Sequence, residues 1–118
     1  MRNREYGDYI EDISVSIDAI EEFVKDINFE DFKRDRKTIF AVIRAIEIIG
    51  EATKHIPKAI RNRYPKIPWK DMAGMRDKVI HEYFGVDVRV VWETATRHLP
   101  EIRPLIQNVL KDMEKKRG

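Results

Sequence analysis

Hydrophobic residues spaced three and four positions apart run along most of the chain, which is the pattern of helices with one buried face. The first run predicts a helix over 6–27, with acidic side chains on its opposite face. A second run predicts a long helix over 39–64, preceded by capping side chains at 28–31. Pro57 lies inside this run, and because proline lacks a backbone N–H, we expect a kink or a fresh start there.

The second half of the chain predicts two more helices. Two prolines within 64–68 indicate a connector, after which a third helix begins near Trp69. We expect it to give way around 83–85, since Gly85 readily takes the left-handed conformation that ends helices.

The last predicted helix is capped by Asp87 and runs over 88–113, with a kink or restart at Pro100 and Pro104. No stretch shows the sustained alternation of a strand. The predicted fold class is therefore all-α, an antiparallel four-helix bundle with kinked long helices. A chain of 118 residues fits a single domain, which we assign to 1–118.

Composition removes several kinds of chemistry. The chain has no cysteine, which excludes disulfides, thiolate zinc sites and a thiol nucleophile. The amino-terminal residues lack the apolar core of a signal peptide, and no apolar run approaches the roughly 20 residues that a membrane span needs. We expect a soluble, cytoplasmic protein with no membrane partner.

The charges are unevenly distributed, although the formal net charge is only +2. Residues 1–31 hold ten acidic and three basic residues, a net charge of −7. Residues 54–78 hold eight basic and two acidic residues, a net charge of +6, and a polyanion would prefer this region. The cations at its start either guide RNA or form an ordinary solvated face: Lys54, Lys58, Arg61 and Arg63.

The sequence predicts neither a metal site nor a cofactor. His55, His81 and His98 are far apart, and no HExxH or clustered carboxylate motif is present. The five glycines stand alone along the chain, so there is no glycine-rich phosphate loop.

The stretch 75–83 holds the candidate chemistry, with Arg76, Asp77, His81 and Tyr83. On a continuous helix, Asp77 and His81 would be one turn apart, so that the carboxylate could orient the imidazole and raise its basicity. Arg76 and His81 would point about 140° apart. Three arrangements could still unite them: the arginine side chain curls round, the helix frays before His81, or the same segment of a second subunit completes the site across a two-fold axis.

An arginine and a histidine form a minimal set for cleaving RNA through its own 2'-hydroxyl without a metal. Histidine exchanges protons with the attacking or leaving oxygen, and arginine stabilises the charge that builds on phosphorus. DNA lacks this internal nucleophile. On spacing alone, a helix bearing these residue types is more often a plain polar surface.

The stretch Arg76-Asp-Lys-Val-Ile-His81-Glu-Tyr83 resembles the R-x4-H-x-Y motif of HepT-like toxins, which belong to the HEPN superfamily of helical domains. The resemblance extends to Arg44-Ala-Ile-Glu-Ile-Ile-Gly-Glu-Ala52, similar to the R-x-x-E-x-x-G-E-A helix of that family, and to Ile67-Pro-Trp-Lys-Asp-Met72. It therefore covers essentially the whole chain.

The resemblance implies a dimeric HEPN bundle and a metal-independent endoribonuclease that inhibits growth. It assigns cleavage to Arg76 and His81, with Asp77 as an orienting residue. It also implies an antitoxin partner, a minimal nucleotidyltransferase that transfers AMP to the motif tyrosine, Tyr83. A homodimer is expected, and a larger complex with the antitoxin remains open.

Other residues are assigned structural roles. Gly50 should let another helix come close, and Arg44 with Glu47 and Glu51 should form an ion-pair ladder along one helix. Phe84 and Trp92 flank the motif, where they either support dimerisation or are plain core residues.

Two further functions compete with the nuclease. A non-catalytic helical dimer could bind a nucleotidyltransferase and its nucleotide without cutting RNA. A DNA-binding protein ranks last, because no helix-turn-helix spacing with a base-reading face is present.

Overall fold

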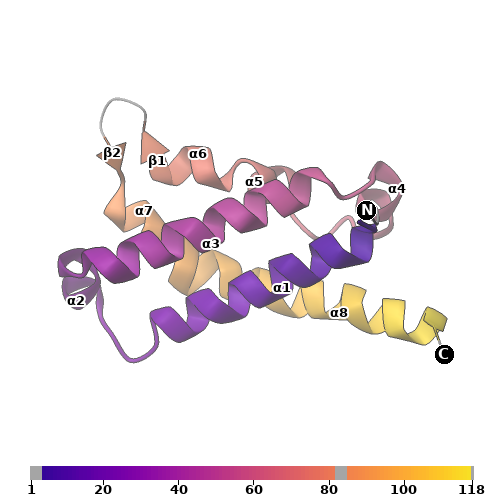
Figure 1. Ribbon diagram of the computed structural model, residues 1–118, viewed down its shortest axis with the longest axis horizontal. Helices are drawn as coiled ribbons and strands as arrows, with labels where there is room; N and C mark the ends of the chain where they lie inside the picture. Colours follow the sequence, from indigo (N-terminus) through magenta and orange to yellow (C-terminus); the bar gives the residue numbers. More distant parts are fainter. Residues whose placement is uncertain (1–3, 82–84, 118) are drawn as a thin grey trace.

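The first half of the chain folds into two long helices joined by a short one. The computed structural model describes residues 4–81 and 85–117, without the side chains of His81 and Arg117. The first elements, which Figure 1 labels, are α1 (Tyr6–Phe23), α2 (Phe29–Arg34) and α3 (Arg36–Lys54).

Helix α1 forms where the spacing of isoleucines predicts it, and Ile10, Ile13, Ile17 and Ile20 are all buried. It ends at Phe23, about one turn before the predicted end at 27. The chain then turns through Asp26, whose φ of 61° is left-handed and cannot continue a helix. The six-residue helix α2 was not predicted. Its N-cap is Asn28, whose side chain accepts a hydrogen bond from the Asp31 N–H at 2.8 Å.

The predicted fresh start at Pro57 is confirmed. Helix α3 ends at Lys54, and Pro57 is the N-cap of a new helix, α4 (Lys58–Arg63). The connector over 64–68 is also confirmed, because helix α5 (Trp69–Ala73) begins directly after Pro68.

The prediction of one helix from Trp69 to 83–85 is wrong. Helix α5 gives way at Gly74 to α6 (Met75–Val79), where the helix ends because Ile80 is extended, with φ −113° and ψ 118°. Two short antiparallel strands follow, β1 (Ile80–His81) and β2 (Gly85–Val86), which the sequence pattern did not indicate.

The last helical run follows directly, and it stays helical through both prolines. It comprises α7 (Val88–Glu93), a π-helical turn η1 (Thr94–His98) and α8 (Leu99–Arg117). Its irregularity is the π turn just before Pro100, where a regular helix would need the N–H that proline lacks. A restart at Pro104 is not observed, since this residue lies inside α8.

Successive helical runs alternate in direction along the long axis of the molecule (Figure 1). Helix α1 runs antiparallel to α3, the α5–α6 segment runs back along α3, and α7–α8 returns again. The all-α fold class is confirmed, whereas the number of four helices is not, because the runs are interrupted at Pro57 and Gly74. The core draws on all of these runs: Ile13, Val42, Ile46, Met72, Val79, Val91, Leu99 and Ile106.

Trp92 is partly buried and packs against two phenylalanines of α2. Its ring lies 5.1 Å from that of the fully buried Phe32 and 6.1 Å from that of Phe29, measured between centroids. This favours the core alternative for Trp92, whereas Phe84 lies outside the described residues.

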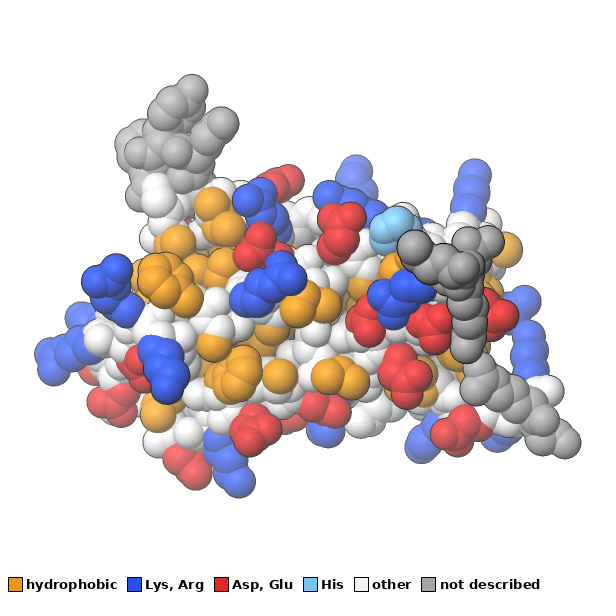
Figure 2. All heavy atoms as spheres, viewed as in Figure 1, with side chains coloured by type: hydrophobic (Ala, Val, Ile, Leu, Met, Phe, Trp, Pro, Cys, Tyr) orange, Lys and Arg blue, Asp and Glu red, His pale blue; other side chains and the backbone are white. Residues whose placement is uncertain are grey.

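Some large hydrophobic side chains of the described residues stay exposed on α1 and α3. Val15 is 63% exposed and Phe40 56% exposed. Figure 2 looks onto these two helices and shows hydrophobic side chains along them, between charged ones. None of the described helices combines the length and apolar character that crossing a bilayer requires.

Candidate functional site

Arg76 and His81 lie on either side of the end of a helix. Arg76 belongs to α6, which ends at Val79, and His81 belongs to β1, where it is paired with Gly85 of β2. The backbone N–H of Asp87 donates to the carbonyl of Val79 at 2.9 Å, which ties the second strand back to the end of α6.

This geometry corrects the spacing argument for Asp77 and His81. Because α6 ends at Val79, these residues are not one turn apart on a continuous helix. Of the three arrangements considered for Arg76 and His81, the structure shows the helix ending before His81. The side chain of His81 and all of Tyr83 lie outside the described residues, so their roles stay predictions.

The side chain of Arg76 is held by a carboxylate from another helix. Its Nε donates to Glu47 Oε2 at 3.3 Å, and its Nη1 lies 3.9 Å from Asp77 Oδ1. The arginine is 53% exposed, Glu47 33% and Asp77 84%. A half-exposed guanidinium with a fixed partner is well placed to meet an anionic group from solvent.

This contact was not predicted, because Glu47 was assigned to an ion-pair ladder within α3. Glu47 instead pairs with Arg76, and Glu51 lies 3.8 Å from His55 Nε2. Among the described residues, Arg44 forms no ion pair with either glutamate, so the predicted ladder is wrong. The usable signal was the R-x-x-E-x-x-G-E-A helix, whose first glutamate is Glu47.

Gly50 explains how α6 comes to lie over Glu47. A Cβ atom at Gly50 would meet the carbonyl oxygens of Ala73 at 3.4 Å and Met72 at 3.5 Å. The predicted close approach of another helix is therefore confirmed, and that helix is α5. Because Glu47 lies one turn before Gly50, the segment that follows α5 passes directly above it.

A polar groove between α1 and α3 is lined by Arg44 and Glu47 at one end. It encloses about 180 Å³ and continues past Glu51 to His55. The ring of Tyr9 stacks on His55 with centroids 4.6 Å apart, and the guanidinium of Arg4 lies 4.5 Å above the Tyr9 ring. The acids and bases of the groove are mixed, so it has no strong preference for either sign of charge.

The sequence also matches a family of known proteins. The family described as Ribonuclease HepT-like matches residues 13–109, which is most of the chain. The chain belongs to the HepT-like ribonuclease family.

Two relatives of this HepT-like chain align with it over nearly their whole length. It is 54% identical over 108 residues to the "Probable ribonuclease HepT" of Thermococcus cleftensis, covering 92% of this chain and 98% of that protein. It is 48% identical over 116 residues to a "Putative RNase" of Methanocaldococcus jannaschii, covering 98% of this chain and 100% of that protein. No solved structure matches.

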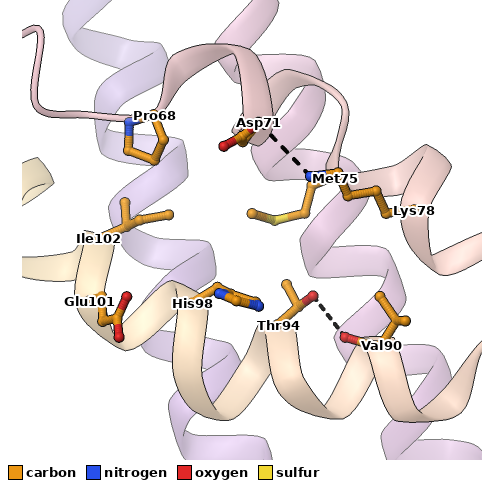
Figure 3. A pocket seen from close by; sticks show the side chains of 9 residues that line it. All are labelled: Pro68, Asp71, Met75, Lys78, Val90, Thr94, His98, Glu101 and Ile102. Atoms are coloured by element: carbon orange, nitrogen blue, oxygen red, sulfur yellow. Dashed lines mark hydrogen bonds and ion pairs between the residues drawn. The ribbon is translucent and has the colours of Figure 1, made fainter.

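A second cavity of the HepT-like domain, of about 320 Å³, lies on another side of α6 (Figure 3). Met75 and Ile102 form part of its apolar wall, and its rim carries the Lys78 ammonium, 3.9 Å from Asp71, together with His98. Lys78 and Arg76 are two positions apart on α6 and therefore point about 200° apart around it. The cavity is thus separated from the Glu47 contact by the width of α6.

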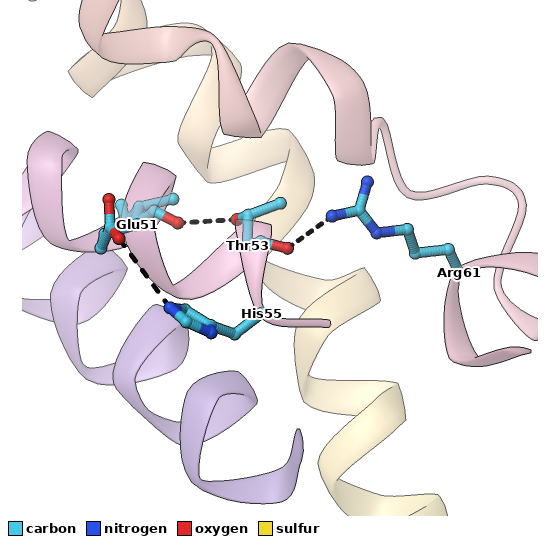
Figure 4. Close-up of polar contacts among 5 residues, drawn as sticks. Glu51, Thr53, His55 and Arg61 are labelled. Atoms are coloured by element: carbon cyan, nitrogen blue, oxygen red, sulfur yellow. Dashed lines mark hydrogen bonds and ion pairs between the residues drawn. The ribbon is translucent and has the colours of Figure 1, made fainter. Parts of the chain in front are cut away.

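One of the four cations proposed to guide RNA has a structural role (Figure 4). The guanidinium of Arg61 donates to the carbonyl of Thr53 at 2.7 Å, in the last turn of α3, and to that of Ile56 at 3.0 Å, just after the helix. Lys54, Lys58 and Arg63 are exposed. Arg61 should therefore be set aside as an RNA contact.

Proposed function

We propose that this chain is a metal-independent endoribonuclease that cleaves RNA through the 2'-hydroxyl. The observation that carries the proposal is an intact R-x4-H-x-Y motif in a HepT-like chain whose relatives are named as ribonucleases. The half-exposed guanidinium of Arg76, beside the turn that leads to His81, supports it.

The reaction uses the nucleophile that the substrate carries. His81 takes the proton from the 2'-hydroxyl or delivers one to the leaving 5'-oxygen. The 2'-oxygen attacks phosphorus, and the guanidinium of Arg76 stabilises the negative charge on the phosphorane oxygens. The products are a 2',3'-cyclic phosphate and a 5'-hydroxyl.

The proposal includes regulation by a minimal nucleotidyltransferase antitoxin, which makes the chain the toxin of a toxin–antitoxin pair. In sequence, Tyr83 stands between the two strands, two positions after His81. AMP transferred to its hydroxyl would add a negative charge and bulk near Arg76 and His81. Both effects oppose the binding of a substrate phosphate.

We further propose that the active unit is a homodimer. The exposed Val15 on α1 and Phe40 on α3 support a protein contact, because a partner that covers such large hydrophobic side chains removes their apolar surface from water. Sedimentation of wild type and Phe40→Asp tests this. A wild-type dimer that becomes monomeric in the variant is expected, and a wild-type monomer contradicts the proposal.

The nuclease is tested by incubating wild type and His81→Ala with total RNA and a tRNA pool in EDTA, and by mapping the new ends. We expect cleavage by wild type alone, leaving cyclic phosphate ends. Mass spectrometry must first show that Tyr83 is free of AMP. Absence of cleavage by that unmodified protein would favour the non-catalytic binding module instead.

A further inference from the structure

The contact between Glu47 and Arg76 joins two elements that are 29 positions apart in the sequence. Glu47 lies on α3, a 19-residue helix that packs against both α1 and α5. Arg76 lies on α6, a five-residue helix between Gly74 and the first strand. The long helix therefore supplies a fixed point against which the short one can be aligned.

The nitrogen that Glu47 uses decides what the contact can do. The carboxylate accepts from Nε at 3.3 Å, on the side of the guanidinium. Nη1 is 3.9 Å from the exposed carboxylate of Asp77, which is beyond hydrogen-bond distance. The two terminal nitrogens can then form the paired hydrogen bonds that arginine makes with phosphate oxygens, while Glu47 keeps the group in place.

We propose that Glu47 is a positioning residue for Arg76 in RNA cleavage, an inference that rests on the proposed function. Its carboxylate restricts the rotation of a long side chain, so that the guanidinium is already oriented when charge develops on the phosphorane. In the opposite role, the Glu47 carboxylate would compete with the RNA phosphate for the guanidinium of Arg76, and RNA would have to break the ion pair before it binds. The use of Nε favours positioning, because a phosphate at the terminal nitrogens leaves that bond intact.

The test compares kcat and KM for wild type, Glu47→Gln and Glu47→Asp on one RNA substrate. Glutamine has the shape of glutamate without its charge, so the fold should survive, which thermal unfolding checks. We expect Glu47→Gln to lower kcat by about tenfold to a hundredfold with little change in KM. Glu47→Asp keeps the charge and should recover part of the loss.

Glu51→Gln is the matched control. Glu51 lies on the same helix one turn further on, and its near partner is His55 rather than Arg76. We expect its kcat to stay within about twofold of wild type, as for a surface substitution away from the site. An equal loss in both variants would indicate a general electrostatic effect of α3 and overturn the proposal.

A double-mutant cycle with Arg76→Lys tests whether Glu47 acts through the arginine. Lysine has no Nε–H fork for Glu47 to hold, so Glu47→Gln should cost little in the Arg76→Lys background. Independent, multiplicative losses would overturn the inference. A higher kcat or tighter RNA binding in Glu47→Gln would show competition instead.

The failure of this inference can be told from the failure of the proposed function. If wild type cuts RNA, His81→Ala does not, and Glu47→Gln cuts as fast as wild type, only the role of Glu47 is overturned. If wild type with unmodified Tyr83 does not cut, both are overturned.

Discussion

Arg76 and His81 are five positions apart, and the end of α6 lies between them. A continuous helix would direct them to different faces, whereas the extended conformation of Ile80 lets the chain change direction before His81. The five positions from Arg76 to His81 therefore span the end of a helix and the start of a strand, and not a single helix. The backbone of Arg76 is held by α6, and the backbone of His81 is held by its pairing with Gly85.

Replacing Arg76 by lysine should keep the charge but lose the geometry. A guanidinium offers paired donors to phosphate oxygens, whereas an ammonium is a point charge on a flexible stem. We expect Arg76→Lys to lower kcat roughly a hundredfold or more, measured as initial rates of RNA cleavage. Lys78→Ala, which removes a cation from the cavity side of the same helix, should change the rate less than about twofold. Equal losses in the two variants would argue against a specific role for Arg76.

Tyr83→Phe separates cleavage from regulation. The phenyl ring lacks the hydroxyl that we propose as the AMP acceptor but keeps the shape of tyrosine, so we expect cleavage near the wild-type rate. Incubation with the nucleotidyltransferase and ATP, followed by intact mass measurement, should add AMP to wild type and not to Tyr83→Phe. AMP on the variant would place the acceptor elsewhere, and loss of its cleavage would make Tyr83 part of the reaction.

At the scale of elements, the packing of α5 on α3 determines where α6 begins. Gly50 permits this packing, since the nearest carbonyl oxygens of α5 would lie 3.4 and 3.5 Å from an added Cβ. These are contact distances, so a methyl group fits but a larger side chain does not. The position of Arg76 over Glu47 thus depends on a residue that takes no part in their ion pair.

Two substitutions at Gly50 should have opposite effects on the free energy of unfolding. Gly50→Ala should leave it unchanged or raise it by up to about 1 kcal/mol, because alanine favours the helix and its methyl group fits. Gly50→Leu should lower it by about 1–3 kcal/mol, because the side chain must displace α5. Urea unfolding followed by circular dichroism measures both. A Gly50→Leu protein as stable as wild type would show that α5 can move away without cost.

The connector after α4 is held to α8 by a hydrogen bond from the Tyr64 hydroxyl to Asp112 Oδ2, at 2.7 Å. Burial raises the pKa of Tyr64, and the hydrogen bond to Asp112 adds to the increase. With a raised pKa in the folded state, the contribution is full below the pKa of the unfolded chain, about 10. It is lost as the pH rises through the folded pKa.

Tyr64→Phe should therefore be less stable than wild type by about 1 kcal/mol near neutral pH, the usual value of one such bond. The difference should narrow above about pH 10, because wild type then loses stability as the unfolded chain releases the phenolic proton. Urea unfolding at pH 7 and in the alkaline range measures both values. A difference that stays constant into the alkaline range would show that the hydroxyl does not respond to its surroundings.

Local signals predicted where several helices begin. Pro57 forced a new helix, and Trp69 and Asp87 opened helices where the sequence placed them. Ends were harder to predict, because the backbone leaves the helical conformation at Asp26 and Ile80, and neither is a glycine or proline that would signal a stop. Helix α6 ends where the chain pairs with β2, and two-residue strands are too short to show alternation.

Only part of the candidate site could be predicted from the sequence. The motif and the close approach at Gly50 could be read from the sequence, since each depends on a local pattern. The partner of Arg76 could not, because Glu47 has a potential partner of its own at Arg44, and only the packing of α5 on α3 decides between them.

At the scale of the whole molecule, the basic segment 54–78 is spread along the long axis rather than gathered at the motif. The molecule extends 46 Å in this direction. Helix α4 lies at one end and the two strands toward the other, near α2, α7 and the start of α3 (Figure 1). Lys54, Lys58 and Arg63 are thus remote from the strand that holds His81. The positive charge of this part of the chain is therefore no evidence that RNA binds at the α4 end.

The end near the motif has cations of its own. Arg34, Arg36 and Lys37 are exposed at the junction of α2 and α3, and no carboxylate of the described residues forms an ion pair with them. The nearby carboxylate of Asp35 is engaged as the N-cap of α3, where it accepts hydrogen bonds from the backbone N–H and hydroxyl of Thr38. These three cations are available to phosphates that flank the cut.

Reversing three charges at each end compares the two surfaces directly. We expect Arg34→Glu/Arg36→Glu/Lys37→Glu to weaken RNA binding roughly tenfold or more. If three phosphate contacts are lost, the negative slope of log K against log salt concentration should become shallower by about 2. Lys54→Glu/Lys58→Glu/Arg63→Glu is the matched control, with the same change in charge. We expect it to weaken RNA binding less than about threefold, because salt screens the long-range repulsion between these charges and the RNA. Binding is measured with His81→Ala protein, so that the RNA stays intact. If the control loses more affinity than the first variant, RNA follows the α4 end, and the segment 54–63 regains the guiding role that its charge first indicated.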